Sequence, residues 1–157
     1  MKEIKYIVGD ATQPQGKENK IIVHVCNDIG GWGKGFVVAI SKRWPEPEQQ
    51  YREWFKSGEN FELGEVQFVQ VEDNLWVANL IGQRKIRKDE FGNPPVRYEA
   101  INLGIEKVAK KASELKASVH MPRIGCGLAG GKWEHIEPIL QKNLSQENIE
   151  VIVHDFN

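Results

Sequence analysis

The sequence predicts an α/β fold in three layers, with a mixed, mostly parallel sheet covered by helices on both faces. The first observation is that strand-like and helix-like segments alternate along the chain. The second is that residues 20–26 form a near-continuous β-branched run, which is typical of a strand buried on both faces. Alternation of this kind indicates parallel strands joined through helices. We expect a single domain spanning residues 1–157, because the chain has the length of one ordinary domain.

The expected order of elements is β-β-α-α-β-β-α-β-α-β. Strands are expected at 3–8, 20–26, 65–71, 75–81, 118–121 and 149–153, and helices at 36–44, 46–55, 98–115 and 133–144. Apolar residues step by three and four along 98–115, which predicts an amphipathic helix. Pro45 separates the first two helices and Pro122 ends the fifth strand. Residues 72–74 read as the turn of a hairpin, and 82–96 as a long polar loop.

The charges nearly cancel, with 21 Lys and Arg against 22 Asp and Glu. This balance argues against bulk binding of nucleic acid, which needs a clear excess of basic residues. No apolar stretch is long enough to cross a membrane, and the first residues lack the apolar core of a signal peptide. Two cysteines are too few for a disulfide framework and fit a reducing compartment. We therefore expect a cytoplasmic monomer with no membrane partner.

Two glycine-rich loops, 27–35 and 125–131, each follow a predicted strand and precede a predicted helix. Ligands of open α/β sheets bind at the carboxyl ends of the strands. Backbone N–H groups near a helix N-terminus can surround an anion, and glycine permits the positive φ and the close approach that this requires. The pair of loops favours a phosphate-bearing ligand. The alternative is that these glycines only form turns.

Other familiar motifs are absent from the sequence. Neither G-x-G-x-x-G nor G-x-x-x-x-G-K-[ST] occurs, and there is no nucleophile elbow and no H-E-x-x-H. His24 and Cys26 share one side of a strand, but no second pair with metal-ligand spacing accompanies them, so we expect no metal and no cofactor. Cys26 is expected to be a buried small hydrophobe. Cys126 could be buried or take part in its loop.

Three segments together resemble macrodomains, the ADP-ribose-binding family. They are Gly9-Asp10-Ala11-Thr12, then Val25-Cys26-Asn27 followed by Gly31, Gly33 and Gly35, and finally Met121-Pro122-Arg123-Ile124-Gly125-Cys126-Gly127-Leu128. The last segment is most similar to the branch of the ADP-ribose-1''-phosphate phosphatase and the terminal ADP-ribose protein glycohydrolase. Residues 24–51 look most like the phosphatase. The resemblance covers essentially the whole chain.

The resemblance implies a set of ligand contacts. Asp10, with the Ala11 backbone beside it, would accept a hydrogen bond from adenine, and Asn27 would contact the distal ribose. The glycines of the first loop would let it approach that ribose, with Trp32 as a lid, and Phe156 would stack on adenine. The second loop would surround the diphosphate. The implied ligand residues are Asp10, Ala11, Asn27, Gly31, Trp32, Gly33, Gly35, Gly125, Cys126, Gly127, Leu128 and Phe156. Without the resemblance, Asp10 and Asn27 are as well explained by local turns, and Phe156 by packing in the core.

The catalytic positions are less complete. The related glycohydrolase uses a lysine and an aspartate where this sequence has Gln83 and Ala129, which argues against a lysine adduct here, although Arg84 and Lys85 adjoin Gln83. The phosphatase-like branch has a functional histidine at the position of His24, and an imidazole can act as acid, base or nucleophile. Asp28 is expected to assist it. Hydrolysis of an ADP-ribose derivative is therefore one hypothesis. The others are a reader that binds ADP-ribose without turnover, and an unrelated scaffold whose glycines are only turns. For His24 itself, the alternative is a side chain packed in a buried strand and hydrogen-bonded to the backbone.

Overall fold

The computed structural model describes residues 2–156 and confirms the expected order of elements. Its sheet has six strands in the order β1-β6-β5-β2-β4-β3. All neighbouring strands are parallel except β3 and β4, which form the predicted antiparallel hairpin. The strands are β1 (Lys5–Val8), β2 (Lys20–Asn27), β3 (Val66–Glu72), β4 (Leu75–Gln83), β5 (Ser118–Met121) and β6 (Val151–Asp155).

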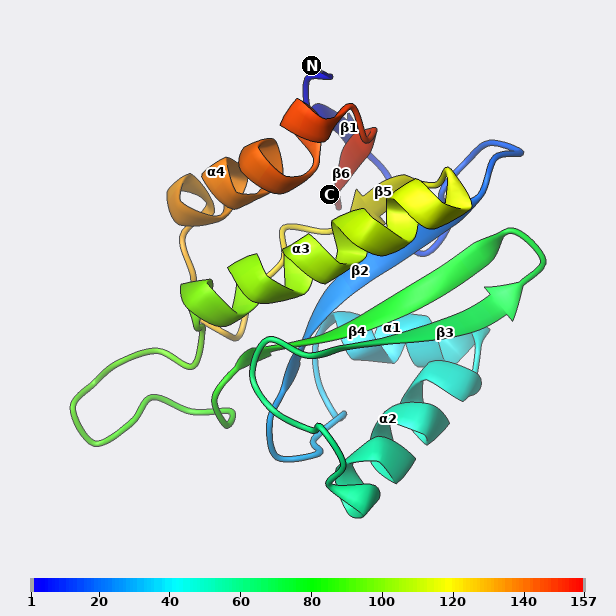
Figure 1. The fold of residues 1–157 in the computed structure, drawn as a ribbon. Helices are drawn as coiled ribbons and strands as arrows, with labels where there is room; N and C mark the ends of the chain where they lie inside the picture. Colours follow the sequence, from blue (N-terminus) through cyan, green and yellow to red (C-terminus); the bar gives the residue numbers. More distant parts are fainter. Residues whose placement is uncertain (1, 157) are drawn as a thin grey trace.

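Helices cover both faces of this sheet, as Figure 1 shows. They are α1 (Phe36–Arg43), α2 (Glu46–Ser57), α3 (Tyr98–Leu115) and α4 (Trp133–Asn143), followed by the short 3-10 helix η1 (Ser145–Glu147). The larger apolar core lies between the sheet and α3 and α4, and a smaller one lies under α1 and α2. No helix within residues 2–156 combines the length and the apolar character needed to cross a membrane.

Strand β2 is buried on both faces, as its β-branched run predicts. Ile21 and Val23 point into the core of α3 and α4, whereas Ile22 and Cys26 point into the core of α1 and α2. Side chains alternate along a strand, so His24 lies on the same face as Cys26, beneath α1 and α2. Cys26 is 3% exposed, which confirms its expected place in the core.

Several predicted boundaries need correction: β1 begins at Lys5 rather than at 3, α2 ends at Ser57 rather than at 55, and β6 ends at Asp155 rather than at 153. Strand β4 runs to Gln83, two residues beyond the prediction, because its last residues stay buried and paired with β2. The final strand begins at Val151 rather than 149, because Ile149 still donates its N–H to the carbonyl of Leu144 after η1. Of these shifts, the extensions of β4 and β6 lie at the carboxyl ends of the parallel strands, where the predicted ligand loops are.

The part of the sheet that α1 and α2 leave open is polar. Ser118, His120 and His154 are all buried there, with His120 Nδ1 3.0 Å from His154 Nε2. His120 Nε2 lies 2.9 Å from the Ser118 hydroxyl, which donates to Glu18 of the loop after β1 at 3.4 Å. Burial lowers the pKa of His120 to about 4 and lowers that of His154 as well. No helix within residues 2–156 packs on this part of the sheet, and hydrogen bonds among Ser118, His120 and His154 connect the side chains that lie on it.

Candidate functional site

A cavity of about 1620 Å³ opens at the carboxyl ends of the central strands, where the sequence predicts the ligand site. Three loops enclose it: the first glycine loop after β2, the β4–α3 loop, and the second glycine loop after β5. Figure 1 shows these three connections at one end of the sheet. The predicted residues that line the cavity are His24, Asn27, Gly31, Gly33, Gly35, Gly125, Gly127 and Leu128.

Asn27 shapes the first glycine loop. Its Oδ1 accepts the N–H groups of Ile29 and Gly31 at 3.0 and 2.9 Å, and its Nδ2 donates to the Gly31 carbonyl at 2.8 Å. A Cβ on Gly31 would lie 3.0 Å from both Asn27 Nδ2 and Ile86 Cδ1, which explains the glycine there. Asn27 therefore makes the local turn that its residue type allows, and it does so at the edge of the cavity.

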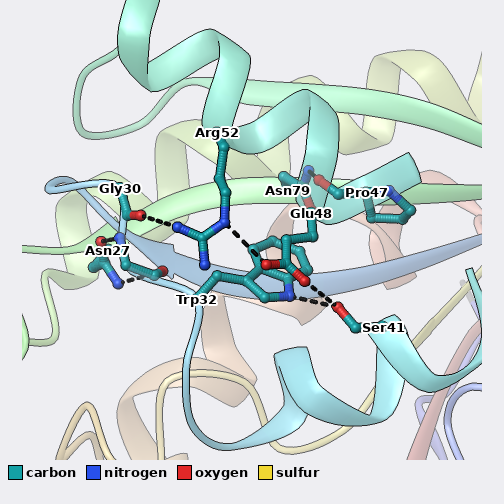
Figure 2. Close-up of polar contacts among 9 residues, drawn as sticks. Asn27, Gly30, Trp32, Ser41, Pro47, Glu48, Arg52 and Asn79 are labelled. Carbon is teal, nitrogen blue, oxygen red and sulfur yellow. Dashed lines mark hydrogen bonds and ion pairs between the residues drawn. The ribbon is translucent and has the colours of Figure 1, made fainter. Parts of the chain in front are cut away.

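Helix α2 also supports the first glycine loop, through hydrogen bonds from two of its side chains. The buried hydroxyl of Tyr51 lies 2.6 Å from the Asn27 carbonyl and 2.9 Å from Asn27 Oδ1. Figure 2 shows Arg52 extending from α2 towards the Gly30 carbonyl at 3.4 Å, while its Nε donates to Glu48 at 2.9 Å. Glu48 also accepts from Ser41, which in turn accepts the indole N–H of Trp32. The loop is thus tied to both helices beneath it.

The second glycine loop is shaped mainly by its own backbone. The N–H of Gly131 donates to the Gly125 carbonyl at 2.7 Å, and that of Gly130 to the Gly127 carbonyl at 3.1 Å. Gly125 has φ +72°, a conformation that favours glycine. The N–H groups of Gly127, Leu128 and Ala129 donate to no acceptor within residues 2–156. All three residues line the cavity, so this loop offers consecutive backbone donors to a ligand.

A second set of backbone donors lies at the start of α1. No side chain caps this helix, and Gly35, which precedes it at φ +85°, lines the cavity together with Phe36 and Val37. The first N–H groups of a helix have no partner within the helix and favour an anion nearby. The two loops therefore provide donors from two sides of the same cavity, as the sequence predicts.

His24 lies at the floor of the cavity, almost sealed from solvent. Its Nε2 is 2.6 Å from Asn79 Oδ1, and its ring packs edge-on against Trp32. The side-chain amide of Asn79 donates its two hydrogens to the Pro47 carbonyl and to Gln67 Oε1. The atom of Asn79 that faces His24 is therefore the oxygen, which can only accept a hydrogen bond, so His24 Nε2 carries the proton. Nδ1 is then unprotonated, with the Cys26 sulfur 3.9 Å away. Burial lowers the pKa of His24 to about 4, so the imidazole is neutral near pH 7.

Asp28 turns away from His24 towards the β4–α3 loop. Its Oδ1 accepts the N–H of Lys85 at 2.7 Å, and it is not among the residues that line the cavity. Gln83 and Ala129, which stand at the glycohydrolase positions, do line it. Gln83 donates to the Lys85 carbonyl at 2.8 Å. Asp28 and Gln83 together fix Lys85 in a left-handed conformation with φ +57°.

Five predicted ligand residues lie outside the cavity lining: Asp10, Ala11, Trp32, Cys126 and Phe156. Trp32 is 6% exposed and packs between His24 and Tyr51, which corrects the expectation of a lid. The N–H of Cys126 bonds the Arg123 carbonyl within its own turn, so it does not face a ligand. Phe156 is 83% exposed, which excludes the alternative of core packing.

Asp10 makes the most side-chain hydrogen bonds of these outlying residues. Its Oδ1 accepts the N–H and hydroxyl of Thr12 at 2.8 and 2.6 Å, and its Oδ2 accepts from Arg43 at 3.1 Å. Hydrogen bonds from Thr12, with Arg43 beside it, outweigh desolvation and hold the pKa of Asp10 below its usual value. Buried Ala11 follows it. Asp10 thus makes the turn that its position after β1 favours, and it keeps its negative charge.

Among residues 2–156, no three His, Cys, Asp or Glu side chains are close enough together to hold a metal ion. Sequence reasoning missed the residues that shape the site from a distance, above all Tyr51, Arg52 and Asn79. None of them belongs to a motif. Only the helical period of α2 could have suggested that Tyr51 faces inward, and nothing in the sequence indicates that it meets Asn27.

Together, these features define an α/β protein with a cavity at the carboxyl ends of parallel strands, lined by two glycine loops with backbone N–H groups that have no acceptor within residues 2–156. No protein-family model matches the chain. Its structure is similar to a macrodomain protein from Streptomyces coelicolor, with 53% identity, TM-score 0.88, and coverage of 99% of this chain and 100% of that one. The chain therefore belongs to the macrodomain family. A protein of unknown function from Bacteroides thetaiotaomicron is 58% identical, with TM-score 0.97 and 98% of each chain covered.

Two further relatives differ in how much of them this chain spans. The chromodomain-helicase-DNA-binding protein 1-like of Danio rerio is 34% identical over 155 residues, which cover 93% of this chain but only 15% of that protein. An ADP-ribose 1''-phosphate phosphatase of Lodderomyces elongisporus is 27% identical over 88% of this chain and 91% of its own length.

Proposed function

We propose that this macrodomain binds ADP-ribose and hydrolyses an ADP-ribose derivative, either at a 1'' phosphate or at an ADP-ribosyl linkage, in the cytoplasm as a monomer. The observation that carries the proposal is the pair of backbone donor sets at Gly127–Ala129 and at the start of α1, whose residues line one and the same cavity. Two sets of backbone N–H donors at one cavity suit a diphosphate, which has two adjoining anionic groups. The relative named for ADP-ribose 1''-phosphate supports the same ligand.

Catalysis is assigned to His24. Asp28, expected from the sequence to assist it, accepts the N–H of Lys85 and does not line the cavity, so any effect of Asp28 on turnover would act through the β4–α3 loop. The imidazole of His24 is neutral near pH 7 and has an unprotonated Nδ1, so it can accept a proton from an attacking water but has none to give at that nitrogen. The neutral ring can therefore act only as a proton acceptor at Nδ1, and its lowered pKa makes it a weak one near pH 7. Asn79 holds the tautomer in place, as an orienting group does in other catalytic pairs.

A reader without turnover is the second candidate function, and specific observations favour it. His24 is only 1% exposed, and Gln83 and Ala129 replace the lysine and aspartate of the related glycohydrolase. In this case the cavity would bind ADP-ribose and release it unchanged. The two loops would then serve recognition alone.

Turnover assays separate the two candidates. ADP-ribose 1''-phosphate and mono-ADP-ribosylated protein are offered to the protein and to His24→Ala and Asp28→Ala, and binding of ADP-ribose is measured in parallel by calorimetry. Loss of turnover with retained binding in His24→Ala supports the hydrolase. Binding without turnover in the unaltered protein establishes the reader, and unchanged rates in both variants would remove the catalytic assignment.

A further inference from the structure

The β4–α3 loop lines the cavity with basic side chains, whereas the two glycine loops line it mainly with glycines and other uncharged residues. Residues 84–91 carry Arg84, Lys85, Arg87 and Lys88, and all four line the cavity beside the first glycine loop. Lys34 of the first glycine loop lines it as well. The chain as a whole has a net charge of −1, so the basic residues gathered here are a local feature.

These five basic side chains are not neutralised by the rest of the protein. None has a carboxylate within ion-pair distance or donates a side-chain hydrogen bond within residues 2–156. In contrast, the side chains of the other two arginines that line the cavity already donate hydrogen bonds to protein acceptors. Arg97 donates to three backbone carbonyls, and Arg123 makes a two-bond pair with Asp155.

The two carboxylates of the loop, Asp89 and Glu90, are fewer than the five free basic side chains, so they do not cancel the positive charge of the wall. Asp89 accepts the N–H groups of Phe91 and Asn93 and the side-chain amide of Asn93, so it shapes its own turn. Glu90 is exposed, and it is the one other carboxylate among the residues that line the cavity. The wall therefore presents an excess of positive charge to whatever fills this end of the cavity.

Asp28 fixes the base of this loop against the first glycine loop. It accepts the N–H of Lys85 at 2.7 Å, and Gln83 donates to the carbonyl of the same residue at 2.8 Å. Ile86 packs so close to Gly31 that a Cβ there would lie 3.0 Å from its Cδ1. Lys85 is held at φ +57°, a conformation that a lysine rarely adopts without such restraint.

We propose that loop 84–91 is a second anion-binding wall, which selects ligands that carry a phosphate beyond the diphosphate, and that Asp28 is the positioning residue that holds it. The backbone donors of the glycine loops suffice for the diphosphate, so the five free basic side chains remain for a further phosphate. This inference rests on the proposed function, because it concerns the group attached to bound ADP-ribose. It makes Asp28 a hydrogen-bond acceptor for the loop backbone, with no direct contact to the ligand.

The test compares the calorimetric affinity of ADP-ribose with that of ADP-ribose 1''-phosphate. We expect the phosphorylated ligand to bind about tenfold more tightly, because each charge-assisted contact is stronger than a neutral one, and this preference should shrink as salt is added. Arg87→Gln with Lys88→Gln should remove most of the preference and leave ADP-ribose binding intact. The matched control, Lys110→Gln with Lys142→Gln, removes two exposed lysines from α3 and α4 and should change neither affinity.

Asp28 is tested by two substitutions. Asp28→Asn keeps an oxygen that can accept the Lys85 N–H and should preserve the preference for the phosphorylated ligand. Asp28→Ala loses that oxygen and should reduce the preference. If Asp28→Asn lost the preference as fully as Asp28→Ala, the positioning role would be wrong, since a carboxylate charge would then be required.

The source of the phosphate is distinguished by a third ligand, the methyl ester of ADP-ribose 1''-phosphate. A preference that extends to the ester supports a wall that takes a phosphodiester, and a preference confined to the free phosphate supports a wall for a terminal monoester. Equal affinity for all three ligands in the unaltered protein overturns the proposal while leaving the proposed function in place. Failure to bind even ADP-ribose removes the proposed function itself.

Discussion

The two glycine loops line the same cavity but keep their shapes by different means. The first is braced by side chains, because Asn27, Tyr51 and Arg52 all bond to it from β2 or α2. The second is held by its own backbone, chiefly through the bond from Gly131 to the Gly125 carbonyl. Truncation of a bracing side chain should therefore disturb the first loop more than the second. In the second loop, the most disruptive change should be an added Cβ at Gly131, which would meet the Gly125 backbone.

The largest effect is expected from Asn27→Ala in the first loop. It removes the acceptor of the Ile29 and Gly31 N–H groups at a buried position and one of the two acceptors of the Tyr51 hydroxyl, so stability should fall by about 3 kcal/mol. ADP-ribose affinity should fall with it. Urea unfolding measures the change, with Gln141→Ala on the exposed face of α4 as control. A loss of less than about 1 kcal/mol would mean that the brace matters little.

The second loop should be most sensitive at Gly131. A Cβ there would lie 2.4 Å from the Gly125 carbonyl oxygen, so Gly131→Ala should lower stability by about 2 kcal/mol and weaken ligand binding. Gly127→Ala is the matched control, because no atom lies within 4 Å of its added Cβ. Equal thermal stability of the two variants would show that the loop backbone can relax.

Acid should weaken the protein through its buried histidines. The pKa values of His24 and His120 fall from 6.5 to about 4 on folding, so the unfolded chain binds more protons between these values. Stability is full above about pH 6.5 and should decline towards pH 4, by up to about 1.4 kcal/mol per pH unit for each histidine. Urea unfolding across this range measures the slope. His24→Gln should reduce the slope by about half, and an unchanged slope would contradict the assignment.

The smallest effect is expected from Arg52→Gln. Its contacts to Glu48 and to the Gly30 carbonyl are exposed, and surface ion pairs of this kind contribute below about 0.5 kcal/mol. Thermal unfolding at low and high salt should show a difference close to the error of the measurement. A large loss would mean that Arg52, rather than Asn27 and Tyr51, supports the first loop.

The sequence was most informative where local pattern decides structure. The period of Tyr98–Leu115 placed α3, the β-branched run placed β2, and the glycine loops placed the cavity at the strand ends. It failed where a side chain could be placed only by tertiary contacts. Trp32 sits in a glycine loop yet packs into the core. Asp28 bonds to Lys85, which is 57 positions away in the sequence, and no local pattern reports such a contact.

The central claim is that backbone donors of both loops hold ADP-ribose in one cavity. Calorimetric titration of ADP-ribose into the unaltered protein, Gly131→Ala and the α4 surface control Gln141→Ala tests it most directly. We predict saturable binding of one ADP-ribose per chain, a clear loss in Gly131→Ala and normal binding in Gln141→Ala. No binding to the unaltered protein, or full binding to Gly131→Ala when that variant is folded, would contradict the claim.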